Sequence, residues 1–116
     1  MLEMIKGNSV DMDVNITLSG HPYQISGHQL WFTVKAARRD TDPQAYGQII
    51  TGSGISIINA ASGFCTMSLT PQQTDNFPVG ATLECDVQMR TPEGKVYTVL
   101  FEQIEMTERV THAFSQ

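Results

Sequence analysis

Apolar and polar residues alternate with a period of two over much of this chain. The first such segment is VDMDVNITL, residues 10–18, in which every second side chain is apolar. This pattern is typical of an antiparallel strand with one buried face and one solvated face. Similar alternation covers residues 30–35, 64–69, 83–89 and 104–110, and shorter apolar segments cover 46–51, 55–58 and 95–101. We therefore expect about seven or eight short strands.

One segment between these strands has the features of a helix start. Thr70 is followed by Pro71 and, three positions after the threonine, by Gln73. A threonine cap, a proline at the first helical position and a glutamine that completes a capping box together favour a helix. Pro78 and Gly80 are expected to end it after about two turns. We expect this helix to carry the chain from one sheet to another.

A tight turn precedes the last long apolar segment. Thr91-Pro92-Glu93-Gly94 fits a type I turn closed by a glycine bulge, so residues 95–101 are expected to return as a hairpin partner. Tyr97, Val99, Leu100 and Phe101 make this segment apolar on both of its phases. That composition predicts that part of the outer face of the sheet is also covered.

Short strands at regular spacing with one helical turn predict an all-β fold. The profile is that of an immunoglobulin-like antiparallel β-sandwich of about seven or eight strands with one short helical crossover. The Cys…Trp…Cys spacing of antibody domains is absent, so the prediction concerns the architecture and not that family. We assign residues 10–110 to the sandwich, 1–9 to an N-terminal arm and 111–116 to a C-terminal tail.

Charge and hydropathy argue against two classes of partner. The 116 residues carry a formal net charge of −5, whereas a nucleic-acid-binding domain normally has a basic stripe. The only basic pair, Arg38-Arg39, is followed by Asp40 and Asp42. No apolar run approaches the roughly 20 residues of a membrane-spanning helix, and the N-terminal residues lack the apolar core of a signal peptide. We expect no nucleic-acid or membrane partner, and synthesis in the cytosol.

No group of residues predicts catalysis or metal binding. Asp11, Asp13 and Asn15 match the opening of a calcium loop, but Ile16 stands where that loop needs glycine and Pro22 where it needs a bidentate glutamate. Their alternating apolar neighbours favour an extended strand instead. The three histidines lack the spacing of a metal-ligand pair. We therefore expect a non-enzymatic protein without a cofactor or metal.

The two cysteines, Cys65 and Cys85, fall on the apolar phase of their strands. In that phase they could approach each other in the core, where a disulfide closing that loop would contribute roughly 3 kcal/mol. Without a secretion signal, two buried free thiols are favoured over the disulfide.

Trp31 is the residue that bears most directly on interactions. The strand phase of Leu30, Phe32 and Val34 points its indole away from the core. An outward Trp either packs over neighbouring residues of the sheet or anchors a partner, since Trp is enriched at interface hot spots. The sequence leaves both roles open. The residues that we expect at an interface are Trp31, Arg38, Arg39, Tyr46 and Phe114.

Several turn and core motifs follow one another in an order that resembles a known module. These motifs are Gly20-His-Pro-Tyr-Gln-Ile-Ser-Gly27, Leu30-x-Phe32-x-Val34, Ile55-x-Ile57 with Ala60-Ala61-Ser62-Gly63, Leu69-Thr70-Pro71-x-x-Thr74 with Pro78-x-Gly80, and Asp86-Val87-Gln88 with Gly94-Lys95-Val96-Tyr97. They resemble the immunoglobulin-like module of tailed-phage virion proteins, above all the N-terminal domain of phage baseplate upper proteins. The likeness covers nearly the whole chain, from Lys6 to Thr107, and lies in turn and core spacing.

The resemblance implies a bacteriophage virion structural protein that is made in the host cytoplasm and assembles in multiple copies. Its expected place is the tail, baseplate or head–tail region, where it would act as an adaptor between other virion proteins and copies of itself. Two alternatives stay open. One is a capsid decoration or cement protein, and the other is a module that binds a host-surface glycan through residues 38–44 and Gly52–Gly54.

Overall fold

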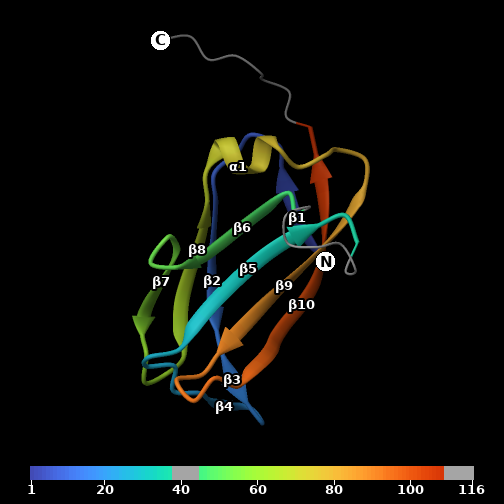
Figure 1. Cartoon of the computed structure of the whole chain (residues 1–116). Coiled ribbons are helices and arrows are strands. Elements are labelled where there is room, and N and C mark those ends of the chain that lie inside the picture. Colours follow the sequence, from blue (N-terminus) through green and yellow to red (C-terminus); the bar gives the residue numbers. More distant parts are fainter. Residues whose placement is uncertain (38–44, 109–116) are drawn as a thin grey trace, which may run out of the picture.

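The computed structural model describes residues 1–37 and 45–108 (Figure 1). Its strands are β1 (Leu2–Ile5), β2 (Val10–Asn15), β3 (Thr17–Leu18), β4 (His21–Pro22), β5 (Gln29–Lys35), β6 (Gly47–Thr51), β7 (Gly54–Asn59), β8 (Phe64–Leu69), β9 (Thr82–Arg90) and β10 (Val96–Thr107). One helix, α1 (Pro71–Asp75), lies between β8 and β9. The prediction of an all-β fold with one short helix is therefore confirmed.

Eight of the strands form one mixed sheet in the order β1-β10-β9-β5-β6-β7-β8-β2. The sheet curls on itself into a nearly barrel-shaped body, and β3 and β4 form a separate two-stranded hairpin (Figure 1). Two of the pairings are parallel, β1 with β10 and β6 with β7, and the others in this sheet are antiparallel. The sequence predicted only antiparallel pairing, and the two parallel pairings correct that prediction.

The core lies inside the curled sheet and follows the predicted alternation. On β5, Leu30, Phe32 and Val34 point inward and are almost completely buried, as are Cys65 on β8 and Cys85 on β9. Both cysteines are free. The prediction of two buried free thiols is confirmed.

Helix α1 begins where the sequence predicted it and ends earlier. The Thr70 side chain accepts a hydrogen bond from the backbone N–H of Gln73, and the Gln73 side chain accepts from the backbone N–H of Thr70, so the capping box is complete. The helix stops at Asp75, short of the expected two turns. The following Phe77 is fully buried and contributes to the core, so the chain must turn inward before a second helical turn can form.

The first residues are part of the sheet, which corrects the prediction of an N-terminal arm over residues 1–9. Leu2 pairs with Ile104 and Ile5 with Thr107 in the parallel β1–β10 ladder. Met4, between them, is buried in the core. The segment offers only two inward-facing side chains, which is too short an alternation to reveal a strand. The predicted domain end at residue 110 and the tail 111–116 lie outside the described residues.

Strand β10 contains a bulge that the sequence pattern could not place. The register with β9 shifts between Thr98 and Leu100, so Val99 is the extra residue. The shift puts Tyr97 and Leu100 on the inner phase and Phe101 on the outer phase. Tyr97 and Phe101 are both exposed. On the outer face Phe101 is exposed, whereas Thr33 of β5 is buried. The prediction of a partly covered outer face therefore holds at Thr33 and not at Phe101, and the bulge accounts for the two apolar phases.

Candidate binding surfaces

The first candidate surface is the outer face of β6, β5, β9 and β10 around Trp31, here called the Trp31 face. In the sheet register Trp31 stands between Ile50 of β6 and Gln88 of β9. Its side chain is half-buried and lies outside the core, as its strand phase predicted. Two residues further along β5, Thr33 stands between Gln48 and Asp86.

Amide side chains organise the floor of the Trp31 face. The Gln48 amide donates to the Thr33 hydroxyl over 2.9 Å. The Gln88 amide donates to the Asp86 carboxylate over 2.9 Å and to the Thr98 hydroxyl over 2.6 Å. These bonds hold the side chains of four neighbouring strands in fixed positions, since a satisfied polar network restricts its members.

A shallow hollow of about 530 Å³ lies on the Trp31 face. Its walls include Trp31, Gln48, Gln88, Arg90 and Val96. An aromatic ring beside amide and guanidinium donors can stack on the apolar face of a ring-shaped ligand and hydrogen-bond its polar edge.

A smaller hollow of about 200 Å³ lies along the same face near Glu84 and Phe101. One carboxylate oxygen of Glu84 is buried without a hydrogen-bond partner, whereas its other oxygen accepts from the amide of Gln103 over 3.3 Å. A buried acceptor without a partner is costly. At this end of the Trp31 face, the Glu84 carboxylate therefore favours a ligand group that donates a hydrogen bond.

The second candidate surface is a cleft between the two ends of the curled sheet, here called the seam. On one side runs β2 with the following β3, and on the other side runs the first half of β10. Two cavities lie along it, one of about 300 Å³ and one of about 370 Å³. They are lined mainly by apolar side chains, among them Leu2 of β1, Met12 and Val14 of β2, Ile16 after β2, and Tyr97, Val99 and Leu100 of β10.

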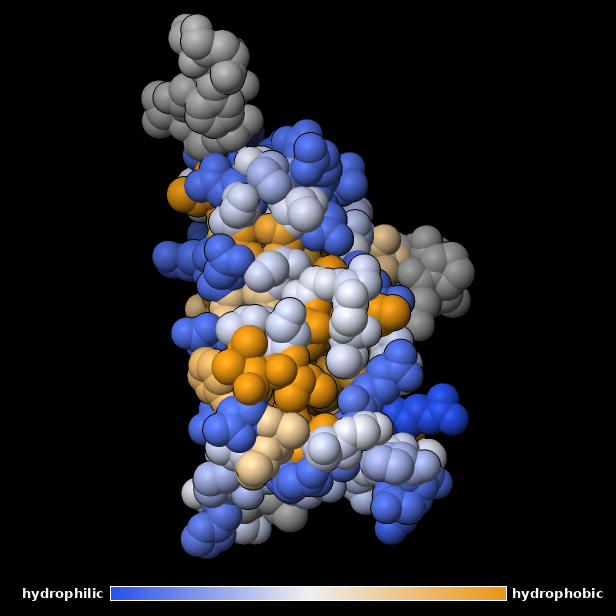
Figure 2. Space-filling view, turned by 90° about the vertical axis from the view of Figure 1, so that its left-hand side faces the viewer, coloured by the Kyte–Doolittle hydropathy of each residue, from blue (hydrophilic) through white to orange (hydrophobic). Residues whose placement is uncertain are grey.

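A third apolar feature lies on β7. Figure 2 looks at the side of the molecule where β7 and β8 run and shows a group of apolar side chains on this surface. On β7, Ile58 is exposed and Ile57 is half-buried.

Two observations concern the reactive side chains among the described residues. No three His, Cys, Asp or Glu side chains in the described ranges gather closely enough to hold a metal ion. Burial raises the pKa of the Cys65 thiol, and burial together with the nearby carboxylates of Glu102 and Asp86 raises the pKa of Cys85 to about 12. Such thiols stay protonated and are poor nucleophiles. The described part of the chain has no helix long and apolar enough to span a membrane.

The structure describes two of the five predicted interface residues, and it places them in different surroundings. Trp31 lies on the face described above, while Tyr46 is half-buried against the core, and its backbone N–H donates to the Val34 carbonyl over 2.8 Å. Arg38, Arg39 and Phe114 lie outside the described residues. The seam was not predicted, and its one signal in the sequence is the run of apolar residues on both phases of 95–101, the segment that contains the bulge and lines one side of the seam.

Comparisons with protein-family models and with curated proteins find no match for this chain. The geometry of its two main surfaces therefore carries the argument about function.

Proposed function

We propose that this protein is a non-enzymatic structural component of a tailed-phage virion, an immunoglobulin-like sandwich that acts as an adaptor at the tail, baseplate or head–tail region. It works through contacts with copies of itself and with other virion proteins. The observation that carries this proposal is the seam, where apolar side chains that belong to the inner face of the sheet stay accessible. Exposed apolar surface of this kind marks interaction sites.

The arrangement of strands supports the sandwich interpretation. Strands β7, β8 and β2 are joined by long antiparallel ladders, and so are β10, β9, β5 and β6. Among the strand ladders of the described residues, the two groups are joined through the short parallel contact of Ile50 and Thr51 with Gly54 and Ile55. Helix α1 connects β8 of one group to β9 of the other, which is the crossover role expected of it.

Mass spectrometry of purified phage particles tests this function directly. We expect the protein in intact particles and, after the particles are separated, in the tail or neck fraction. Cross-linking before digestion should join it to copies of itself and to neighbouring virion proteins. Its presence only on capsids would favour the decoration or cement role instead, and its absence from particles would refute the virion proposal.

A second candidate function is binding of a host-surface glycan on the Trp31 face. The observation that favours it is the combination of a half-buried indole with the fixed amides of Gln48 and Gln88 in one hollow. A glycan array with the wild-type chain tests this role, with Trp31→Ala as the loss variant. Gln72→Ala, an exposed change on α1, is the control. Binding that survives Trp31→Ala would exclude this face.

A further inference from the structure

We propose that the seam is an acceptor site for an extended segment, and that residues 109–116 of a second copy of the chain fill it. The segment would run between β2 and β10 as an added strand. This inference rests on the proposed function and deepens it, because it names the partner and the mode of assembly.

The exposure of β2 shows that its inner face lacks a neighbour. Met12 and Val14 are only half-buried, although their cross-strand partners on β8, Met67 and Cys65, are fully buried. Directly opposed residues on one face of a sheet normally share the same environment. The difference arises because β8 has a strand on both sides, whereas β2 is the last strand of the sheet.

Strand β10 shows the same effect on the other side of the seam. Tyr97 is 46% exposed, although it faces inward and its partner Met89 on β9 is only 3% exposed. Further along the same face, Ile104 and Met106 are 0% and 3% exposed. Burial becomes complete where the β1 ladder begins, at Ile104. The inward side chains of β10 are therefore buried where β1 pairs with this edge, and Tyr97 is exposed where β1 does not reach.

Backbone edges bound the seam on both sides. Within the described residues, no ladder pairs a further strand with the outer edge of β2 from Val10 to Asn15. The same is true of the edge of β10 that faces away from β9, from Val96 to Leu100. An unpaired edge can accept a further strand through backbone hydrogen bonds. Here two such edges flank the apolar cavities, so an inserted strand gains hydrogen bonds and apolar contacts together.

The sequence of residues 109–116, RVTHAFSQ, fits such a site. In an extended segment Val110 and Phe114 lie on one face, and Thr111 and Ser115 lie on the other. Eight residues span roughly 26 Å when extended, which suffices to run along the six residues of β2. The fit of alternating side chains to alternating pockets is how added strands are recognised.

Charge favours this occupant over a second copy of β2. Strand β2 carries Asp11 and Asp13, so pairing two β2 strands would bring like charges together. Residues 109–116 contain Arg109 and no acidic residue, in a chain of net charge −5. Arg109 can therefore lie beside the acidic side chains of β2 without the like-charge repulsion that a second β2 would bring.

The geometry of β10 favours donation to a second copy over insertion into the same chain. Strand β10 ends at Thr107, beside Ile5 of β1. To enter its own seam, the chain would have to reverse direction and pass β1, which already occupies this part of the edge. A neighbouring copy offers an open seam without this obstacle. Because donor and acceptor surfaces differ, the contact is heterologous and joins copies head to tail.

The first test uses the full chain and compares two substitutions in the donor segment. Phe114→Asp places a charge on the face expected in the seam, and Ser115→Asp is its matched control on the opposite face. Analytical ultracentrifugation should show wild type and Ser115→Asp associating with increasing concentration. We expect Phe114→Asp to weaken this association by about tenfold or more, since it removes a buried aromatic side chain.

The second test restores the contact with a probe. A fluorescent peptide of residues 109–116 should bind the Phe114→Asp chain, whose seam is open, and the same peptide with Phe114→Asp should bind at least about tenfold more weakly. Excess unlabelled wild-type peptide should also dissociate the wild-type assembly. The proposal would be overturned if the wild-type peptide neither bound the Phe114→Asp chain nor dissociated the wild-type assembly.

The third test locates the contact by disulfide cross-linking. Asp13→Cys in one copy and Ala113→Cys in another should form a mixed dimer, whereas the exposed Ser56→Cys with Ala113→Cys should not. Preferential cross-linking to Ser56→Cys would overturn donation to a second copy. A monomeric chain in which Ala113→Cys forms the disulfide with Asp13→Cys of the same copy would also overturn it. Association that persists unchanged in Phe114→Asp would overturn the seam contact while leaving assembly through another surface, and hence the proposed function, intact.

Discussion

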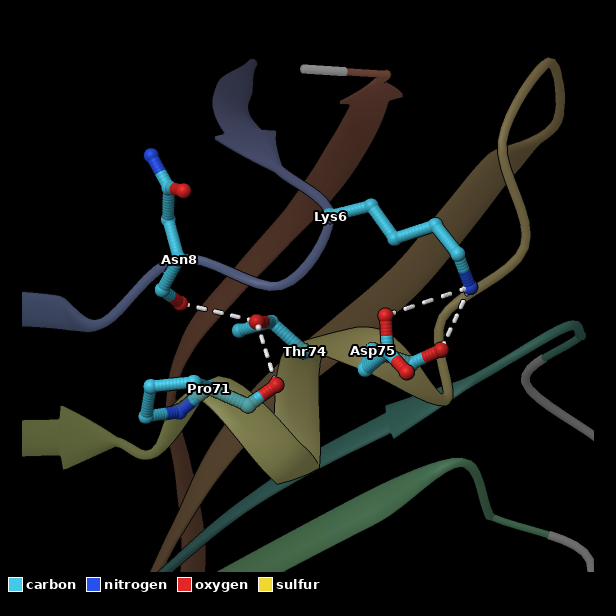
Figure 3. Close-up of polar contacts among 5 residues, drawn as sticks. All are labelled: Lys6, Asn8, Pro71, Thr74 and Asp75. Carbon is cyan, nitrogen blue, oxygen red and sulfur yellow. Dashed lines mark hydrogen bonds and ion pairs between the residues drawn. The ribbon is translucent and has the colours of Figure 1, made fainter. Parts of the chain in front are cut away.

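The hydroxyl of Thr74 donates a hydrogen bond of 2.7 Å to the backbone carbonyl of Asn8, so α1 is tied to the turn between β1 and β2 (Figure 3). The Lys6 ammonium adds a hydrogen bond to the Asp75 carbonyl and an ion pair of 3.9 Å to its carboxylate. Thr74 is fully buried, whereas Asp75 is exposed. The buried hydroxyl is therefore the stronger of the two links that position β1 and β2 at one end of the seam.

Thr74→Val should weaken this link with little change in shape. We expect a loss of about 1 to 2 kcal/mol in the free energy of unfolding, because a buried hydrogen bond disappears. Urea denaturation measures this loss, and hydrogen exchange should show faster exchange of the β1 amides. Gln72→Ala, exposed on the same helix, should change stability by less than about 0.5 kcal/mol. Equal effects of the two substitutions would contradict the role given to Thr74.

Gly63 allows the chain to pass close to the end of β2. A Cβ atom there would lie 2.4 Å from the carbonyl oxygen of Ile16 and 2.5 Å from that of Tyr23, and the residue has a φ of +74°. Gly63→Ala should therefore cost more than about 4 kcal/mol or prevent folding. Gly20→Ala is the control, because Gly20 has a φ of +79° with open space around it. Thermal unfolding should show a loss of only about 1 to 2 kcal/mol for that control.

Leu30 and Trp31 provide a matched pair of neighbours on opposite faces of β5. Leu30 is fully buried, so Leu30→Ala should cost about 2 to 5 kcal/mol of stability. Trp31→Ala should cost about 1 kcal/mol and weaken assembly or ligand binding more than folding. Chemical denaturation and ultracentrifugation of the same two samples separate these effects. A loss of several kcal/mol for Trp31→Ala would make it a packing residue.

The two thiols should be inert in the folded protein. Cys85 has a pKa raised to about 12 by burial and nearby carboxylates, and burial also raises the pKa of Cys65. A thiol reagent at pH 8 should therefore modify neither residue until denaturant is added, when both should react. Rapid modification of the native protein would show that the seam opens far enough to expose the core.

The N-terminal ammonium should make stability depend on pH in the acidic range. It lies 3.1 Å from the Glu102 carboxylate and, with the Gln103 backbone N–H, holds the pKa of Glu102 below its usual value. A lowered folded-state pKa adds stability that is present above the unfolded pKa and is lost as the pH falls through the folded one. Glu102→Gln should flatten this part of the pH profile, measured by thermal unfolding, whereas Glu105→Gln, exposed on the same strand, should preserve it. An unchanged profile in Glu102→Gln would contradict the pairing.

The elements that sequence analysis predicted well are those determined by neighbours in the chain. The capping box of Thr70 and Gln73 was recognisable because its partners lie three residues apart. The turn at 91–94 was recognisable for the same reason, and in the structure Gly94 has a φ of +91° and donates to the Thr91 carbonyl. The outward side chain of Trp31 followed from the phase of its own strand.

The features that escaped prediction depend on contacts between distant segments. Strand β1 exists because Leu2–Ile5 finds an edge about a hundred residues later in the chain. The bulge at Val99 reverses the phase of the residues around it, so no simple alternation could assign their faces. The extent of the seam along β10 is set by the point where the β1 ladder begins, at Ile104, which no local pattern encodes.

The pairing of β1 with β10 also affects how the protein is made. The first strand to leave the ribosome can complete its ladder only after the last strand has been synthesised. Until then the nascent chain carries two open sheet edges, which invite wrong pairing and aggregation. Closure over so long a sequence separation is intrinsically slow. A cell that produces many copies at once therefore has reason to keep these chains apart, or under chaperone protection, until translation ends.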